Sequence, residues 1–183
     1  MNSSSTFTFG LAISDGTVVV NNANAVGTGP LVVNNGGTLN LFGTGTTNTL
    51  TLGVNNLPSG NSFTLNKGGI LNLTLEGDGT SDAINAAAKG VSLAGTLQLD
   101  GTINYSDSYT LFTDFNTLSD SNLAIIGYDT TDYAAKLSST GTLSFIPQEV
   151  DVPEPSTFPL FGLGLGVVGT VFYFRRVRSS AAL

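Results

Sequence analysis

Short runs in which apolar residues alternate with small polar residues recur from residue 16 to residue 145. A typical run starts with Gly or Asn, continues with a small residue and ends in an apolar–x–apolar triplet. Because successive side chains of a strand point to opposite faces, this alternation predicts short strands with one face buried. The runs span residues 16–20, 29–33, 37–41, 48–52, 61–65, 69–73, 95–99, 101–105 and 141–145.

Pairs of Gly and Asn separate the predicted strands. Residues 34–37 (Asn-Asn-Gly-Gly), 55–56 (Asn-Asn) and 68–69 (Gly-Gly) are examples, and such pairs favour turns that need positive φ. Only residues 81–89, in which Ser-Asp precedes a triple Ala, indicate a helical turn or two. The body of the chain is therefore predicted to be all-β.

The repetition of one phrase favours a stacked architecture. In a stack, each coil makes the same contacts with its neighbours, so inward Val and Leu side chains form continuous ladders. We therefore expect residues 1–146 to form a right-handed parallel β-helix (a β-solenoid), with a β-sandwich as the alternative. About 130 residues at roughly 20 per coil predict six or seven coils.

The composition changes after Ile146. Residues 147–157 hold three prolines and three acids. Since proline lacks an N–H and restricts the residue before it, they predict an extended, exposed linker. Residues 158–174 carry no charge, and as a helix they would span roughly 25 Å, at the short end for a bilayer core of about 30 Å. They predict one transmembrane α-helix, with a buried strand or core helix as the alternative.

A basic tail, residues 175–183, follows the predicted transmembrane helix. It contains Arg175, Arg176 and Arg178 and no acidic residue. Arginines directly after an apolar segment act as a stop-transfer signal and remain on the cytoplasmic side. The β body is therefore expected on the other side of the membrane, outside the cytoplasm.

The chain has 13 acidic and six basic residues and no His, Cys or Trp. These absences exclude a Ser-His-Asp triad, a thiol nucleophile, a Cys/His zinc site and a disulfide framework. Residues 1–157 contain all 13 acids and three lysines, a net charge of −10. Such a body repels phosphate backbones, so no nucleic-acid partner is expected. No cofactor is expected either.

Two clusters of side chains are candidates for further chemistry. Glu76, Asp78 and Asp82 are interpreted as a solvated turn, with a weak Ca²⁺ site or a catalytic carboxylate pair as alternatives. Four tyrosines form either a sugar-stacking face or, more simply, part of an aromatic core and cap. They are Tyr105, Tyr109, Tyr128 and Tyr133. With only three scattered lysines to bind a uronate, the chain is predicted not to be an enzyme.

The body resembles the autotransporter-associated β-strand repeats of bacterial surface proteins. Residues 31–41 (Leu-Val-Val-Asn-Asn-Gly-Gly-Thr-Leu-Asn-Leu) are close to the pattern of that repeat. Residues 79–146 look like the last coils and closing strands of the same group. The resemblance implies a β-helix of the passenger type.

The C-terminal residues resemble the PEP-CTERM sorting signal. Residues 152–157 (Val-Pro-Glu-Pro-Ser-Thr), a short Gly-rich apolar segment and an Arg cluster occur in that order. The resemblance implies a Gram-negative, exopolysaccharide-producing bacterium whose inner-membrane exosortase recognises the Pro-Glu-Pro segment and cleaves near it. The sorting residues that it implies are Val152, Pro153, Glu154, Pro155, Ser156 and Thr157, with Arg175, Arg176 and Arg178 as the anchor.

Members of that group normally begin with a secretory signal peptide. Residues 1–10 contain neither a basic n-region nor an apolar h-region. We therefore expect the chain to be the C-terminal part of a longer protein, or to have a misassigned start, with further coils and a signal peptide encoded upstream.

The expected function is that of an exported, exosortase-processed surface or extracellular-matrix protein with a structural or adhesive role, associated with exopolysaccharide. The alternative is a surface-anchored β-helical carbohydrate-active enzyme, a lyase or a glycosidase. The precursor is expected in the inner membrane, and the processed body is expected at the cell surface or in the matrix.

Overall fold

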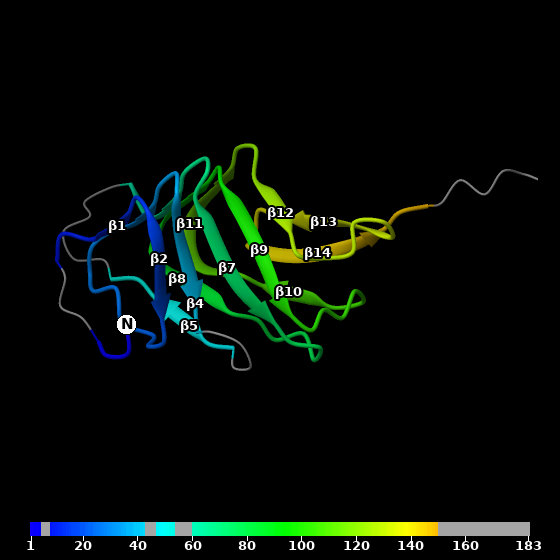
Figure 1. Cartoon of the computed structure of the whole chain (residues 1–183), viewed down its shortest axis with the longest axis horizontal. Helices are drawn as coiled ribbons and strands as arrows, with labels where there is room; N and C mark the ends of the chain where they lie inside the picture. Colours follow the sequence, from blue (N-terminus) through cyan, green and yellow to red (C-terminus); the bar gives the residue numbers. More distant parts are fainter. Residues whose placement is uncertain (5–7, 43–46, 54–59, 150–183) are drawn as a thin grey trace, which may run out of the picture. The chain divides into compact units, whose positions relative to one another are not determined.

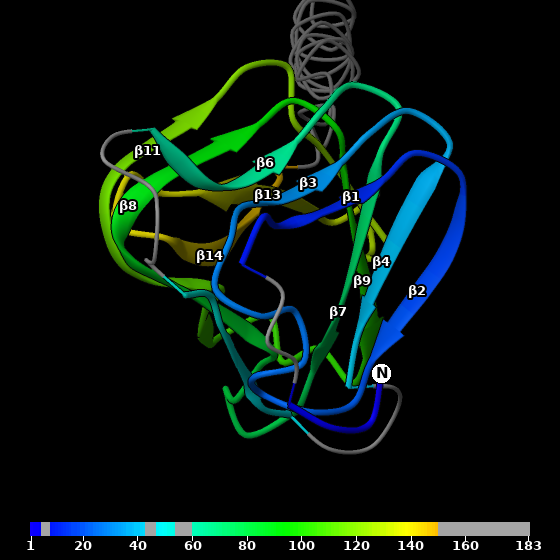
Figure 2. The same ribbon diagram turned by 90° about the vertical axis from the view of Figure 1, so that its left-hand side faces the viewer.

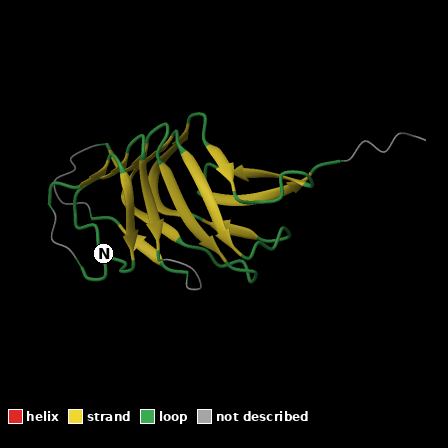
Figure 3. Cartoon of the chain, in the orientation of Figure 1, coloured by secondary structure: helices red, strands yellow, loops and turns green. Residues whose placement is uncertain are grey.

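The described part of the chain contains β-strands and no helix (Figures 1 and 3). The computed structural model describes residues 1–4, 8–42, 47–53 and 60–149. Apart from Glu149, they belong to one compact unit, Met1–Gln148. The all-β prediction is confirmed for this body. The strands are β1 (Leu11–Ile13), β2 (Gly16–Val20), β3 (Leu31–Val33), β4 (Gly37–Leu41), β5 (Thr49–Thr51), β6 (Asn61–Leu65), β7 (Ile70–Leu75), β8 (Ala83–Leu93), β9 (Thr96–Gly101), β10 (Ser108–Thr110), β11 (Phe112–Asp120), β12 (Ala124–Ile126), β13 (Tyr133–Leu137) and β14 (Thr142–Pro147).

Most successive strands alternate between two parallel sheets. The first sheet has the order β1-β3-β6-β8-β11, with β5 also paired to β8, and the second has the order β12-β9-β7-β4-β2. Neighbouring strands of the second sheet are thus separated in sequence by at least one strand of the first. Figure 2 looks onto the stack from the side of β1 and β2.

Three of the four intervals between strands of the first sheet are longer than the expected 20 residues. Leu11, Leu31, Phe63, Val91 and Leu118 are successive cross-strand partners in the first sheet, at intervals of 20, 32, 28 and 27 residues. Each sheet therefore has five strands along its path, and the expectation of six or seven coils is wrong for the described residues. Apolar alternation marks the strands, but it does not determine the lengths of the polar loops between them.

The helical turn predicted for residues 81–89 is wrong, because this segment lies in and just before strand β8. The strand bends at Ala87 and Ala88, which have positive φ angles of 50° and 58°. Before the bend, Ile84 pairs with β5, and after it Val91 pairs with β6. Strand pairing on both sides of the bend outweighs the weak helix propensity of three alanines. Because of the bend, the first part of β8 pairs with β5 and the later part pairs with β6.

The corner between the two parallel sheets repeats from one strand pair to the next. Asn34 Nδ2 donates a hydrogen bond to Ser14 Oγ (3.1 Å), and Asn66 Nδ2 donates one to Asn34 Oδ1 (2.8 Å). A Cβ atom at Gly37 would lie 2.3 Å from the carbonyl oxygen of Ile13, so only glycine fits this close approach. The Gly/Asn pairs that mark turns in the sequence therefore also provide the stacking contacts between turns.

The interior consists of apolar ladders, and a third sheet covers one end of it. Leu39, Leu71 and Leu97 are fully buried partners on β4, β7 and β9. The third sheet is antiparallel, with the order β10-β14-β13. Its Phe145 points into the same continuous core.

Candidate functional site

The last strand of the body is held on both sides. β14 pairs antiparallel with β10 and with β13. Beyond it, the backbone N–H of Gln148 donates to the carbonyl oxygen of Asp132 (2.8 Å), and Gln148 Nε2 donates to that of Tyr133 (3.2 Å). Hydrogen bonds of the body therefore continue to Gln148, four residues before the predicted sorting residues begin.

The residues predicted to carry sorting lie outside the described part of the chain. This applies to the sorting residues 152–157, to the predicted transmembrane helix 158–174 and to the arginines of the tail. Within the described residues, no helix is long and apolar enough to span a bilayer.

Asp82 is a fully buried carboxylate that binds backbone amides. Its two oxygens accept hydrogen bonds from the N–H of Asn48 (3.1 Å) and of Thr74 (2.8 Å). Loss of hydration raises the pKa of Asp82 above its usual value, and the hydrogen bonds from Thr74 and Asn48 oppose that rise. Asp82 thus ties β7 to the residue that precedes β5. Its burial could not be read from the sequence.

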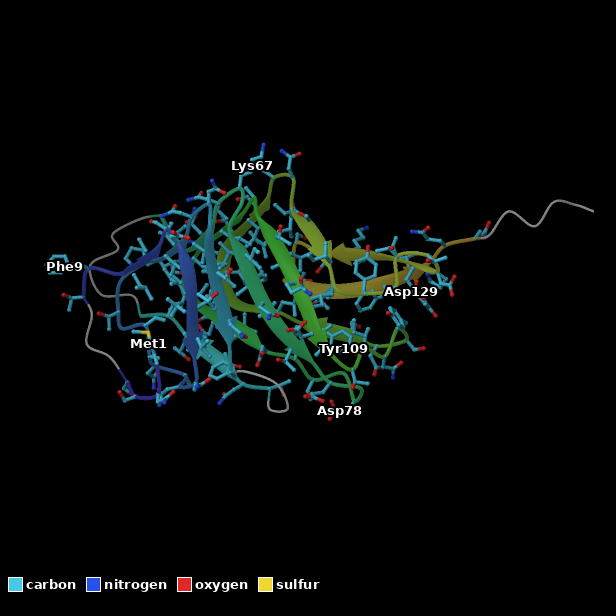
Figure 4. The ribbon with its side chains drawn as sticks, viewed as in Figure 1. Met1, Phe9, Lys67, Asp78, Tyr109 and Asp129 are labelled. Carbon is cyan, nitrogen blue, oxygen red and sulfur yellow. The ribbon has the colours of Figure 1, made fainter. Side chains whose placement is uncertain are left out.

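The other two acids of the cluster do not join Asp82 in a metal site. Asp78 is exposed, as Figure 4 shows, and it accepts hydrogen bonds from the hydroxyl (2.7 Å) and the amide (3.0 Å) of Thr80, which lower its pKa. The backbone of Glu76 closes the same turn through the N–H of Gly79 (3.1 Å). No group of three acidic side chains in the described ranges is placed to hold a metal ion.

The four tyrosines form one aromatic cluster around Phe145. Its ring centroid lies 5.1 Å from that of Tyr105, 6.2 Å from Tyr109 and 5.6 Å from Tyr128, and Tyr133 stacks on Tyr105 at 4.1 Å. The rings pack on one another, which favours the interpretation as core and cap.

Tyr109 is the fully buried member of this cluster. Its hydroxyl oxygen accepts a hydrogen bond from the N–H of Asn104 (2.7 Å), and burial raises its pKa. The bond joins the turn after β9 to strand β10, so this tyrosine has both a packing partner and a polar partner inside the cap.

A row of carboxamides on the outer face of the second sheet was not singled out in the sequence. Asn40 pairs with Asn72, and Asn72 pairs with Gln98, so the three amides stand side by side on β4, β7 and β9, all half-buried. Asn72 Nδ2 donates to Asp100 Oδ2 (2.8 Å). The signal was present, because each amide occupies the x position of a Leu-x-Leu triplet.

The comparisons with known proteins identify the C-terminal segment. The family model of the PEP-CTERM protein-sorting motif matches residues 151–178, which include the predicted sorting residues 152–157 and the arginines of the predicted anchor. The resemblance of the body to autotransporter repeats receives no support. No curated protein and no solved structure matches the chain. The motif supports export of a membrane-anchored precursor and its processing by an exosortase.

Proposed function

We propose that the chain is a precursor that an exosortase cleaves at its C-terminal motif, which leaves the β body as a structural or adhesive component of the cell surface or extracellular matrix. The observation that carries this proposal is the sorting-motif match at residues 151–178. It begins three residues after Gln148, whose hydrogen bonds complete the body. Cleavage within the motif would therefore leave every described strand in place. Before cleavage, the body lies in the periplasm and the arginines lie in the cytoplasm.

The proposed scaffold is a right-handed parallel β-helix. Support comes from the alternation of strands between two parallel sheets and from ladders such as Leu39–Leu71–Leu97. Parallel strands connected by a crossover are right-handed in nearly all known cases. Each added coil extends the same hydrogen-bonded ladder, which suits a stiff structural element.

The proposed polysaccharide contact is the row formed by Asn40, Asn72 and Gln98. Carboxamides both donate and accept hydrogen bonds, and neighbouring strands place them about 4.8 Å apart. Asn40 and Gln98 are the outer members of the row, whereas Asn72 between them donates to Asp100 and has a buried carboxamide oxygen. Many weak contacts to a repetitive polymer add up through multivalency without a deep pocket. The acidic cluster is not assigned a role in contacting a sugar, because the buried carboxylate of Asp82 has no exposed surface with which to reach one.

The sorting proposal is tested by replacing Pro153, Glu154 and Pro155 together with alanine. The chain is produced in a Gram-negative host with and without an exosortase, and the intact mass of the protein is measured in each fraction. The unchanged chain should lose its C-terminal segment only when the exosortase is present. The triple variant should keep its full mass and remain with the membranes.

Asp151→Asn is the matched control, because it removes one negative charge from the same segment and keeps Pro-Glu-Pro. Its processing should equal that of the unchanged chain. Loss of the C-terminal segment from the triple variant, at the same rate as from the control, would show that the motif does not direct cleavage.

A further inference from the structure

One row of side chains crosses the outer face of the second sheet at a single level. It consists of Val19, Asn40, Asn72, Gln98 and Ile126, which are successive cross-strand partners on β2, β4, β7, β9 and β12. Each of its three amides lies between two buried leucines of the same strand, so the row faces away from the core. Figure 1 shows β2, β4, β7 and β9 side by side. We call these residues the five-residue row.

The free polar groups of the five-residue row lie on alternate strands. Among the hydrogen bonds of the described residues, none involves the carboxamide of Asn40. That of Gln98 donates one long bond (3.5 Å), to the carbonyl oxygen of Leu99. Between them, Asn72 donates to Asp100 and has a buried oxygen. A ligand on this face therefore meets available amides two strands apart, with an amide already in use between them.

An exposed apolar side chain adjoins each available amide. Val19 is the cross-strand partner of Asn40, and Ile126 is that of Gln98. They are 39% and 44% exposed and belong to the few large apolar side chains of the described residues that are exposed at all. A sugar ring has an apolar face of C–H groups and a rim of hydroxyl groups. It can thus cover an apolar side chain and bind an amide at the same time.

Charge is nearly absent from this face. Asp100 is the only charged residue in the five strands of the second sheet, and its carboxylate accepts the bond from Asn72 (2.8 Å). The remainder of residues 1–157 adds to a net charge of −10, which repels an anionic polymer. The five-residue row therefore suits an uncharged ligand that is held by hydrogen bonds and apolar contact.

We infer, on the basis of the polysaccharide contact proposed above, that the five-residue row binds a neutral, β-1,4-linked glycan whose chain runs across the strands. Such a chain is extended, and each sugar advances it by close to one strand spacing, about 4.8 Å. Successive sugars are turned over, so every second sugar presents the same edge. Asn40 and Gln98 then bind equivalent edges of two sugars, and the sugar between them covers Asn72. An α-1,4-linked chain curves and loses this match.

The test compares three oligosaccharides on the full chain, in a detergent without a sugar headgroup, by ligand-observed NMR titration. Cellohexaose is the proposed kind of ligand. Maltohexaose contains the same sugar with an α-1,4 linkage, and a hexamer of β-1,4-linked mannuronate keeps the linkage and adds a negative charge to each sugar. Cellohexaose should bind at least about tenfold more tightly than either of the others.

The outcomes separate this inference from the proposed function. Equal affinity for cellohexaose and maltohexaose would overturn the inference and leave a polysaccharide contact in place, and so would tighter binding of the mannuronate hexamer. Absence of binding to all three would overturn the inference and remove the support for that contact. Cleavage by an exosortase is measured separately, on the variant of the Pro-Glu-Pro segment.

The site itself is tested with Asn40→Ala/Gln98→Ala. This variant should bind cellohexaose about tenfold more weakly, because it loses two amides that form hydrogen bonds. The matched control is Thr64→Ala/Ser92→Ala, which removes two half-buried, paired hydroxyls from the outer face of the first sheet. It should bind as the unchanged chain does, and circular dichroism should show that both variants are folded. Equal affinity of the two variants would overturn the assignment of the site.

The direction of the glycan is tested with Ile126→Ala. Three sugars span the distance from Asn40 to Gln98, whereas six also reach Ile126. The variant should therefore bind cellohexaose about threefold more weakly and cellotriose almost unchanged. Ile146→Ala, at a comparably exposed position (49%) on the third sheet, is the control and should change neither affinity. An equal loss for both lengths would overturn the placement of the chain across the strands.

Discussion

The two ends of the described body differ in the strands that lie there. At one end, the antiparallel sheet β10-β14-β13 and the rings around Phe145 cover the interior. In the first sheet, the inward ladder through Val33, Leu65 and Leu93 stops at Asp120, where a carboxylate stands in the next position. At the other end, the first described strands, β1 and β2, belong to the two parallel sheets themselves. Stacking alone does not end a parallel array, so termination needs strands of another direction and a residue that cannot continue the ladder.

The largest predicted effect removes the centre of the covered end. Phe145→Ala should lower the free energy of unfolding by about 3–5 kcal/mol, the usual cost of deleting a buried phenyl ring. The cavity would lie among Tyr105, Tyr109 and Tyr128, whose rings all contact this phenyl group. Urea unfolding followed by circular dichroism measures the loss.

Ile146→Ala is the control, since it changes the next residue of β14 on the opposite, exposed face. Its cost should stay below about 1 kcal/mol. Equal costs for the two variants would mean that the aromatic cluster does not stabilise the covered end, and the comparison between the ends would fail.

A smaller loss of unfolding free energy is predicted for a change at Asp82. This variant tests whether a buried carboxylate contributes more than an exposed one in the acidic part of the body. Asp82→Ala should cost about 2–3 kcal/mol, because the amides of Asn48 and Thr74 lose their acceptor inside the protein. Asp132→Ala is the matched control for urea unfolding, because Asp132 is an exposed acid and its side chain accepts no hydrogen bond from the described part of the chain. A loss as large in the control would show that removal of charge, and not of buried hydrogen bonds, is the cause.

Eight of the fourteen described strands were predicted, because alternation is a local signal. Residues 16–20, 37–41 and 61–65 coincide with β2, β4 and β6. The strand predicted for 101–105 is wrong, since β9 ends at Gly101 and Tyr105 enters the aromatic cluster. Loop lengths, the bend of β8 and the antiparallel cap depend on contacts between distant segments, which no local pattern encodes.

The candidate sites also differ in whether a local sequence pattern predicts them. The sorting motif was recognisable from the sequence because its three parts are contiguous, and a family model matches them at residues 151–178. The role of Asp82 was not predicted, because its partners Asn48 and Thr74 are brought to it only by folding. From the sequence alone, a carboxylate in a Gly-rich stretch is interpreted as solvated, because the strands that bury it are not yet known.

The smallest predicted effect is a difference in pH dependence between Asp82 and Asp78. Burial raises the pKa of Asp82, so the folded protein binds a proton there more readily than the unfolded chain. Its contribution to the free energy of unfolding therefore rises as the pH falls from 7 through the raised pKa. Hydrogen bonds from Thr80 lower the pKa of Asp78, so its contribution is lost as the pH falls below the ordinary value of 3.8 towards the lowered pKa.

Asparagine at either position removes that titration, so the two variants should differ from the unchanged chain with opposite trends. The deficit of Asp82→Asn should widen between pH 7 and about 4, and that of Asp78→Asn should narrow below about pH 4. Each trend is measured from the urea midpoints at about pH 7, 5, 4 and 3, which cover both pH ranges. Each variant serves as the control for the other. Parallel trends would mean that the carboxyl of Asp82 stays hydrated in solution, and the acidic part of the body would then carry its charge on the surface alone.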